Sequence, residues 1–247
     1  MDGPIPYCGP GPRPGEAWAS WNLDPVLLAG LALLLTAGMG RAALRGGGRE
    51  GAAFAAGWAM LAILFVSPIC AMASALFSVR VAHHLLLIAV AAPLLAAALP
   101  LARTGRLGLP LATLVQTVVV WVWHAPAPYD AALGSYAIYW LMQATLLGSA
   151  VAFWMSLRSV GAASAAGASA LLATIVQMGL LGAIITFAPR PLYRYHLATT
   201  PPWGLTPIED QQLAGLLMWV PGAAPYAAVA LVALAGWLAR ARRDRAA

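Results

Sequence analysis

The sequence has 247 residues, of which 62% are hydrophobic and only 9% are charged, and its formal net charge is +6. Soluble domains carry about 25% charged residues. The composition therefore excludes a soluble globular enzyme, a disordered chain and a nucleic-acid-binding module, because each of these needs more charge to stay in water.

The chain begins with a polar segment rich in Pro and Gly, residues 1–24, which holds one arginine and three acids. One arginine among three acids does not make the short basic region with which a signal peptide begins. We expect a retained extracytoplasmic leader. Two cysteines, Cys8 and Cys70, are too few for a disulfide scaffold.

Seven apolar runs follow, each long enough to cross about 30 Å of hydrocarbon at 1.5 Å rise per residue. They span approximately residues 25–44, 51–71, 79–100, 109–126, 134–156, 166–188 and 212–239. Backbone polar groups cannot stay unpaired in lipid, so these runs should be helices. The sequence predicts an all-α, polytopic membrane protein, with a seven-helix domain at 25–239 and a basic cytoplasmic tail at 240–247.

The arginines predict how the chain is oriented in the membrane. With the N-terminus outside, ten arginines and two acids fall at the inner face, whereas four arginines and six acids fall at the outer face. The ten inner arginines are Arg41, Arg45, Arg49, Arg103, Arg106, Arg158, Arg240, Arg242, Arg243 and Arg245. The bias of basic residues toward the cytoplasmic side predicts an N-out, C-in topology.

In this topology all four histidines, His83, His84, His124 and His196, fall in the outer half of the protein. Ionisable groups inside spans are costly and usually functional, and imidazole suits copper and related metals. We therefore expect His84 and His124, with His83 as a third candidate, to be metal ligands reached from outside. The alternative is that each imidazole bonds to a neighbouring carbonyl oxygen and binds nothing.

The segment 189–211 is the densest polar feature, and it leads into the last span. Thr206, Pro207 and Glu209 have the spacing of a helix start, with Thr206 as N-cap. The next polar side chains are expected to support the imidazoles; they are Asp210, Gln211 and Gln212, followed by Met218. Ordinary capping and interhelical hydrogen bonding, and a packing role for the methionine, are the alternatives.

Several segments resemble a known family. They are EDQQLAGLLMWVPG (209–222), LLGAIITFAPRPLY (180–193), WGLTP (203–207), WHAPAPYDAAL (123–133) and the region 67–95. In order along 58–235, they resemble the polytopic CtaG family of cytochrome c oxidase assembly factors, associated with caa3-type oxidases. The residues that carry the family motifs are Trp123, Pro126, Tyr129, Pro189, Trp203, Gly204, Trp219 and Pro221.

The resemblance implies a non-enzymatic, multi-pass protein of the bacterial cell (inner) membrane, with cytochrome c oxidase subunits and the lipid bilayer as its partners. It also implies a role in oxidase maturation near the copper centres. By position, His84 matches the second His of the family's HMxxH segment and His124 matches the His of its WH block. Asp210, Gln211 and Gln212 match directly.

Two departures bear on copper. Arg80 and Val81 stand where the family has its first His and its Met, and Tyr139 and Gln143 stand at the positions of its usual His pair in the fifth span. A cation one turn before His84 would oppose a bound metal. Two other functions therefore stay open: a metal-free scaffold that binds oxidase subunits, and a haem-binding redox protein with His84 and His124 as axial ligands.

Overall fold

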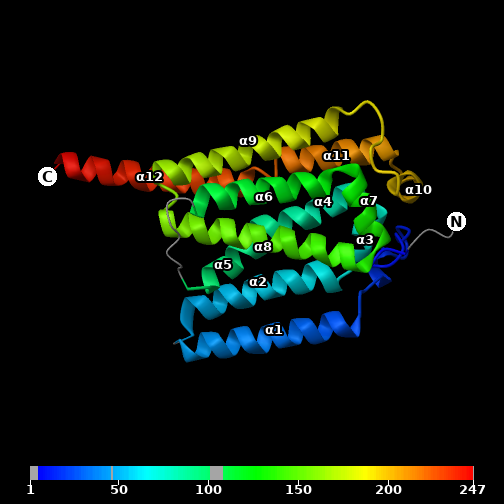
Figure 1. Ribbon diagram of the computed structural model, residues 1–247, viewed down its shortest axis with the longest axis horizontal. Coiled ribbons are helices and arrows are strands. Elements are labelled where there is room, and N and C mark those ends of the chain that lie inside the picture. The colour runs from blue at the N-terminus through cyan, green and yellow to red at the C-terminus, as the bar shows by residue number, and fades with distance from the viewer. Residues whose placement is uncertain (1–4, 46, 101–107, 247) are drawn as a thin grey trace.

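The computed structural model describes residues 5–45, 47–100 and 108–246, with side chains described as far as Arg243. This part of the chain is helical, with no strand, and its long helices lie side by side in one bundle (Figure 1). The long helices are α1 (Pro25–Leu44), α2 (Gly48–Val66), α4 (Phe77–Leu86), α6 (Gly108–His124), α8 (Tyr136–Val160), α9 (Ala165–Phe187), α11 (Pro207–Trp219) and α12 (Ala224–Ala246). The shorter ones are η1 (Ala17–Ala19), α3 (Ile69–Ala75), η2 (Leu87–Ala91), α5 (Ala92–Ala98), α7 (Pro126–Gly134), α10 (His196–Thr199) and η3 (Pro201–Trp203).

The predicted all-α membrane class is confirmed. Six helical stretches of the described residues are long and apolar enough to cross a membrane, and a seventh is obtained if α6 and α7 count as one broken span, bent by 72°. The bend follows the sequence His124-Ala125-Pro126, where Ala125 is extended before the proline. A residue before proline is disfavoured in the α conformation, which explains where α6 ends.

Proline also shapes two other predicted spans, and one of them is interrupted. The run 51–71 is not one helix: α2 ends at Val66, Ser67 is extended before Pro68, and α3 starts anew. The run 79–100 is one stretch, Phe77–Ala98. Its middle, η2, is a π-helical turn just before Pro93, which has no N–H to donate.

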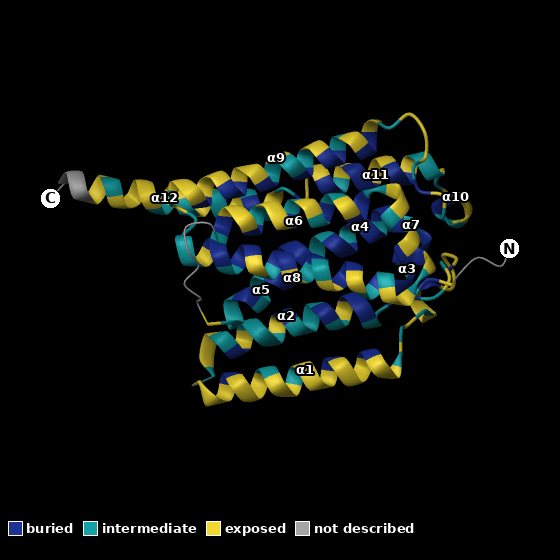
Figure 2. Ribbon diagram, in the orientation of Figure 1, coloured by how far each residue is buried: buried dark blue, intermediate teal, exposed yellow. Residues whose placement is uncertain are grey.

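The last predicted span, 212–239, is two helices. The capping box of Thr206 and Glu209 is present, so the expected helix start is confirmed and α11 begins at Pro207. The chain leaves the helix around Pro221, and α12 then continues through the predicted basic tail and projects beyond the bundle (Figure 1). Much of α12 is exposed, as is most of α1 at the other edge (Figure 2).

The bundle has two chemically different ends. We call the end that carries residues 5–24, α3, α7 and α10 the leader end (Figure 1). The arginines predicted to lie inside are at the opposite end wherever they are described, in α1, α2, α8 and α12; Arg103 and Arg106 lie outside the described residues, as does the side chain of Arg245. The helices thus separate the charges as expected, and the side of the membrane that each end faces stays a prediction.

The leader is a folded cap on the leader end. A disulfide joins Cys8 to Cys70 of α3. The indole nitrogen of Trp203 donates to the carbonyl oxygen of Pro12 at 3.0 Å. The backbone N–H of Asn22 donates to the carbonyl oxygen of Val66 at 2.9 Å. The number of cysteines in the sequence gave no indication of this bond.

Candidate functional site

Two histidines that are far apart in sequence meet inside the leader half of the bundle. The rings of His84, on α4, and His124, on α6, pack edge to face with centroids 5.5 Å apart and an interplanar angle of 88°. Both are buried, with 2% and 5% of their surfaces exposed. Imidazole nitrogens that share an ion each lie about 2 Å from it, so they must be within about 4 Å of each other. Rings this close can satisfy that condition.

Some ring nitrogens of His84 and His124 are not used in hydrogen bonds and keep a free lone pair. Nδ1 of His124 lies 2.7 Å from the Val120 carbonyl oxygen, and only a protonated nitrogen can donate there. The neutral ring therefore has its lone pair on Nε2, and this atom has no partner among the described residues. Neither ring nitrogen of His84 has one either. An imidazole fixed through one nitrogen, with the other free, is the usual arrangement of a metal ligand.

His83 lies beside this pair but faces another helix. Its Nε2 lies 3.1 Å from the Leu64 carbonyl oxygen of α2, and its ring packs edge to face on Phe65. Its Nδ1 has no hydrogen-bond partner in the described part of the chain, and its ring centroid is 5.8 Å from that of His84. Within the described residues, no set of three or more His, Cys, Asp or Glu side chains is placed to hold a metal. The geometry offers a pair of imidazoles with a third ring at its edge.

Arg80 brings a buried positive charge next to the histidines. Only 1% of its surface is exposed, its Nε donates to the Ala73 carbonyl oxygen at 3.1 Å, and its guanidinium carbon lies 5.5 Å from the ring centroid of Tyr139. Its two terminal nitrogens have no hydrogen-bond partner among the described residues. Because Arg80 precedes His84 by one helical turn, its charge acts on any cation bound there.

The residues expected to support the imidazoles do something else. Asp210 accepts hydrogen bonds from the backbone N–H groups of Phe77 and Ser78, at 2.7 and 3.1 Å, and from the Ser78 hydroxyl. It therefore caps the N-terminus of α4, the helix that carries His84. The bonds of Asp210 are thus those of a helix cap, which was the alternative. The expectation that Asp210 orients an imidazole is wrong.

Gln211, Gln212 and Met218 do not orient an imidazole through the bonds described either. The side chain of Gln211 accepts from the Leu192 N–H at 2.6 Å and donates to the Ile185 carbonyl oxygen at 3.2 Å, so it ties α11 to the end of α9. Gln212 is exposed, and Met218 is buried in the core. Of the four residues expected to support the imidazoles, Asp210 and Gln211 brace helix ends instead.

The fourth histidine is structural. Nδ1 of His196 lies 3.2 Å from the Ala75 carbonyl oxygen, and its Nε2 lies 2.7 Å from the Tyr129 hydroxyl, which donates to it. Burial lowers the pKa of His196 to about 3; the bond to Ala75 acts against this shift, and the nearby Arg80 charge contributes to it. The ring is therefore neutral, with both nitrogens occupied, and holds α10 against α3 and α7.

The other motif residues shape the leader end. Trp123 donates to the Thr145 hydroxyl at 2.9 Å, and Gly204 takes a left-handed conformation, φ 77°, that favours glycine. Trp203 contacts the leader as described above, and Tyr129 contacts His196. The three prolines of the motifs lie at helix boundaries: Pro126 starts α7, Pro189 follows α9, and Pro221 separates α11 from α12. The remaining motif residue, Trp219, packs on Phe187.

One supporting residue had not been singled out from the sequence. The Tyr193 hydroxyl donates to the carbonyl oxygen of His124 at 2.8 Å, and its ring stacks on Phe77 with centroids 3.8 Å apart. It therefore links the ends of the two helices that carry His84 and His124. Its place in the matching segment 180–193 was the available indication.

One of three comparisons with known proteins found a family for this chain. The family model described as "Cytochrome c oxidase caa3 assembly factor (Caa3_CtaG)" matches residues 31–109 and 106–240, which together include α2 to α11 and both facing histidines. No curated protein and no solved structure matches the chain. With most of its length matched, the chain belongs to the family of cytochrome c oxidase caa3 assembly factors.

Proposed function

We propose that this protein assists the maturation of an oxidase copper centre by holding Cu(I) transiently between His84 and His124. The observation that carries the proposal is a pair of buried, adjacent imidazoles in which both nitrogens of His84 and Nε2 of His124 have no hydrogen-bond partner among the described residues. A buried nitrogen without a partner costs folding free energy, and a bound ion would offset that cost.

The chemistry of the pair favours copper over harder ions. Magnesium and calcium need several oxygen ligands, whereas imidazole suits copper, and Cu(I) accepts two nitrogen ligands. A monovalent ion also suffers half the repulsion from Arg80 that a divalent ion does. Arg80 would still weaken binding, which suits a protein that passes its copper on.

Two observations support an extracytoplasmic leader end. Disulfides such as Cys8–Cys70 form and persist in oxidising compartments outside the cytoplasm. The described arginines gather at the opposite end, as the positive-inside rule requires of a cytoplasmic face. In a bacterial cell membrane the histidine pair would thus be nearer the outer surface, and oxidase subunits would be met there.

The metal-free scaffold and the haem protein are the alternatives. A scaffold needs only the leader end as a docking surface for an oxidase subunit, and neither histidine would matter. A haem would need a flat space of porphyrin size between two axial rings, whereas His84 and His124 already touch edge to face. The geometry therefore supports copper over haem, and a Soret band in the purified protein would reverse that choice.

The test is made in cells that lack the chromosomal copy and carry His84→Ala or His124→Ala. His196→Gln is the matched control, because it changes a buried imidazole whose nitrogens are both occupied. We expect both Ala variants, at normal protein level, to leave the oxidase deficient in copper and to be partly rescued by added copper, with the control near wild type. Full oxidase copper in both Ala variants would contradict the proposal and favour the scaffold.

A further inference from the structure

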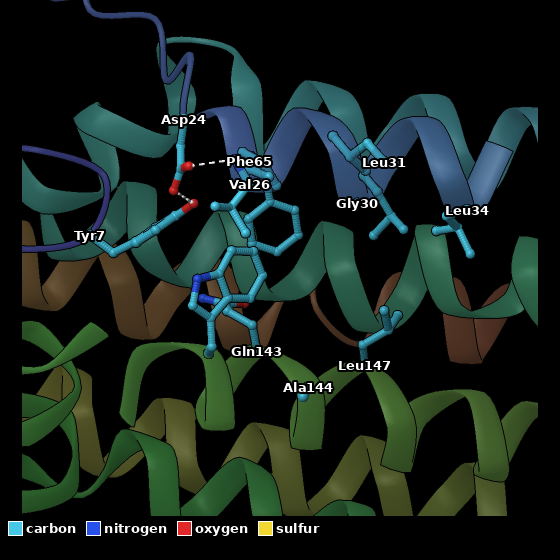
Figure 3. A pocket seen from close by; sticks show the side chains of 13 residues that line it. Tyr7, Asp24, Val26, Gly30, Leu31, Leu34, Phe65, Gln143, Ala144 and Leu147 are labelled. Carbon is cyan, nitrogen blue, oxygen red and sulfur yellow. Dashed lines mark hydrogen bonds between the residues drawn. The ribbon is translucent and has the colours of Figure 1, made fainter. Parts of the chain in front are cut away.

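A groove that plays no part in the histidine site lies between α1, α2 and α8. It has a volume of about 370 Å³, within the range of small-molecule sites. Figure 3 shows its lining, with Tyr7, Asp24, Phe65 and Gln143 toward one end and Leu34 and Leu147 toward the other. Val26 and Leu34 on its walls are 80% and 40% exposed, so the groove opens on the surface of the bundle.

The groove is amphipathic along its length. At the leader end its walls are aromatic: Trp140 stacks on Phe65 with centroids 5.4 Å apart, and Tyr7 packs edge to face on Trp140 at 5.0 Å. From Val26 to Leu34 the aliphatic wall follows α1 for about 12 Å, at 1.5 Å per residue. Because these helices are membrane-spanning stretches, the molecule that reaches the groove comes from the lipid phase.

Gln143 supplies a polar group that nothing in the described residues satisfies. It lines the groove, only 2% of its surface is exposed, and both its amide nitrogen and its amide oxygen lack a hydrogen-bond partner. Such a group is costly to bury. It fits a ligand that presents a carbonyl or hydroxyl oxygen beside the aromatic side chains.

The charge at the leader end disfavours an anionic head group. The Tyr7 hydroxyl donates to Asp24 at 2.6 Å, and this bond lowers the pKa of the carboxyl, which stays anionic. None of the residues lining the groove is an arginine or a histidine. An anionic head group would meet the Asp24 carboxylate with no cation in the lining, whereas an uncharged head group would not.

We propose that the groove binds a prenylated quinone, with its flat head between the aromatic side chains and Gln143 and its tail along α1 and α8. Aromatic rings favour a flat, polarisable head, the amide donates to a quinone carbonyl, and the aliphatic wall receives the tail. The binding is independent of copper and of the histidine pair.

The structure offers a closely matched pair of variants. Gly30 lines the groove, and a Cβ placed on it meets no atom within 4 Å, so Gly30→Leu adds an apolar side chain at the groove wall without a clash at Cβ. Gly40 lies on the same helix, also with open space around its Cβ position, but does not line the groove. Gly40→Leu is therefore the control, since both changes raise helix propensity alike.

Gln143→Leu separates binding from structure. It removes the amide and keeps a side chain of similar size. If the amide serves a ligand, the ligand-free variant should melt at the same temperature as wild type or higher, because a buried unpaired group is lost. Its affinity for the quinone should fall about tenfold, the factor expected for one hydrogen bond.

The experiment titrates decylubiquinone into the full-length protein in nanodiscs of neutral phospholipid and follows tryptophan quenching. The lipid that co-purifies is identified by extraction and chromatography. We expect saturable binding by wild type and Gly40→Leu, at least tenfold weaker binding by Gly30→Leu and Gln143→Leu, and co-purified quinone. Equal affinity in wild type and Gly30→Leu, or phospholipid as the sole molecule lost from Gly30→Leu, would overturn the proposal.

Discussion

The imidazole of His84 on α4 packs edge to face on the imidazole of His124 on α6, with ring centroids 5.5 Å apart. Residues from two distant segments keep these helix ends in place: Asp210 caps α4, and Tyr193 bonds to the carbonyl oxygen of His124. The polar residues of the last third of the chain thus act on the histidines through the helices that carry them.

Removing the charge of Arg80 should strengthen Cu(I) binding. Side chains one turn apart are about 6 Å from each other, and at an effective dielectric constant of about 20 two unit charges then repel by about 3 kcal/mol. We expect Arg80→Gln to raise Cu(I) affinity at least tenfold and Arg80→Lys to leave it nearly unchanged, in competition with a chelator. Weaker binding by Arg80→Gln would show that the guanidinium supports the site.

Loss of the Asp210 carboxylate should destabilise the bundle through α4. Asp210→Ala leaves two buried backbone N–H groups and the Ser78 hydroxyl without their acceptor, which should cost about 3 kcal/mol or more. Thermal unfolding in detergent measures the change. The neighbouring Glu209→Ala removes an exposed cap and should have a much smaller effect; an equal effect would contradict the capping role.

His196 should make the stability of the leader end depend on pH. Its folded pKa, about 3, lies below the unfolded value of about 6.5. Below pH 6.5 the unfolded chain therefore binds more protons than the folded one. The contribution of His196 to the free energy of unfolding is complete above that pH. It is lost as pH falls toward 3, by up to about 1.4 kcal/mol per pH unit. Melting temperatures of wild type and His196→Gln should converge between pH 7 and pH 4.5. Parallel curves would mean that His196 is protonated in the fold.

The Cys8–Cys70 bond should fasten the leader to α3. Removing a native disulfide typically costs about 2–4 kcal/mol, so Cys8→Ser, Cys70→Ser and the double variant should all melt earlier by the same amount. In intact cells, a membrane-impermeant maleimide should label the single cysteine left in each variant once the protein is thermally loosened. Labelling of both cysteines in the untreated wild type would show free thiols and contradict the bond.

The sequence was sufficient for the class of fold because burial in lipid requires helices, and apolar runs of sufficient length are visible in it. It was not sufficient for continuity. Pro68, Pro93 and Pro221 were all visible, yet one separates two helices, one lies in a continuous helix with a π turn, and one marks the break before α12. Whether neighbouring helices satisfy the freed carbonyl oxygens depends on packing, which the local sequence does not contain.

The same limit applied to the site. His84 and His124 were expected to cooperate because both lie in the outer half, but their contact depends on how α4 and α6 are rotated about their own axes. The two backbone N–H groups that Asp210 caps, those of Phe77 and Ser78, lie more than 130 residues away, so the spacing of Asp210 alone could not distinguish a helix cap from an imidazole support. Arg80, expected to oppose a bound cation, does lie buried on the helix of His84.

The most direct test of the central claim is the stoichiometry of Cu(I) bound by purified protein under anaerobic conditions. His84→Leu and His124→Leu serve as variants, since they remove imidazoles that have free nitrogens and should preserve the fold; unchanged melting of the ligand-free forms checks this. We predict one Cu(I) per chain in wild type and in His196→Gln, and none in either Leu variant. Equal copper in wild type and both Leu variants, or no copper in wild type, would contradict the account.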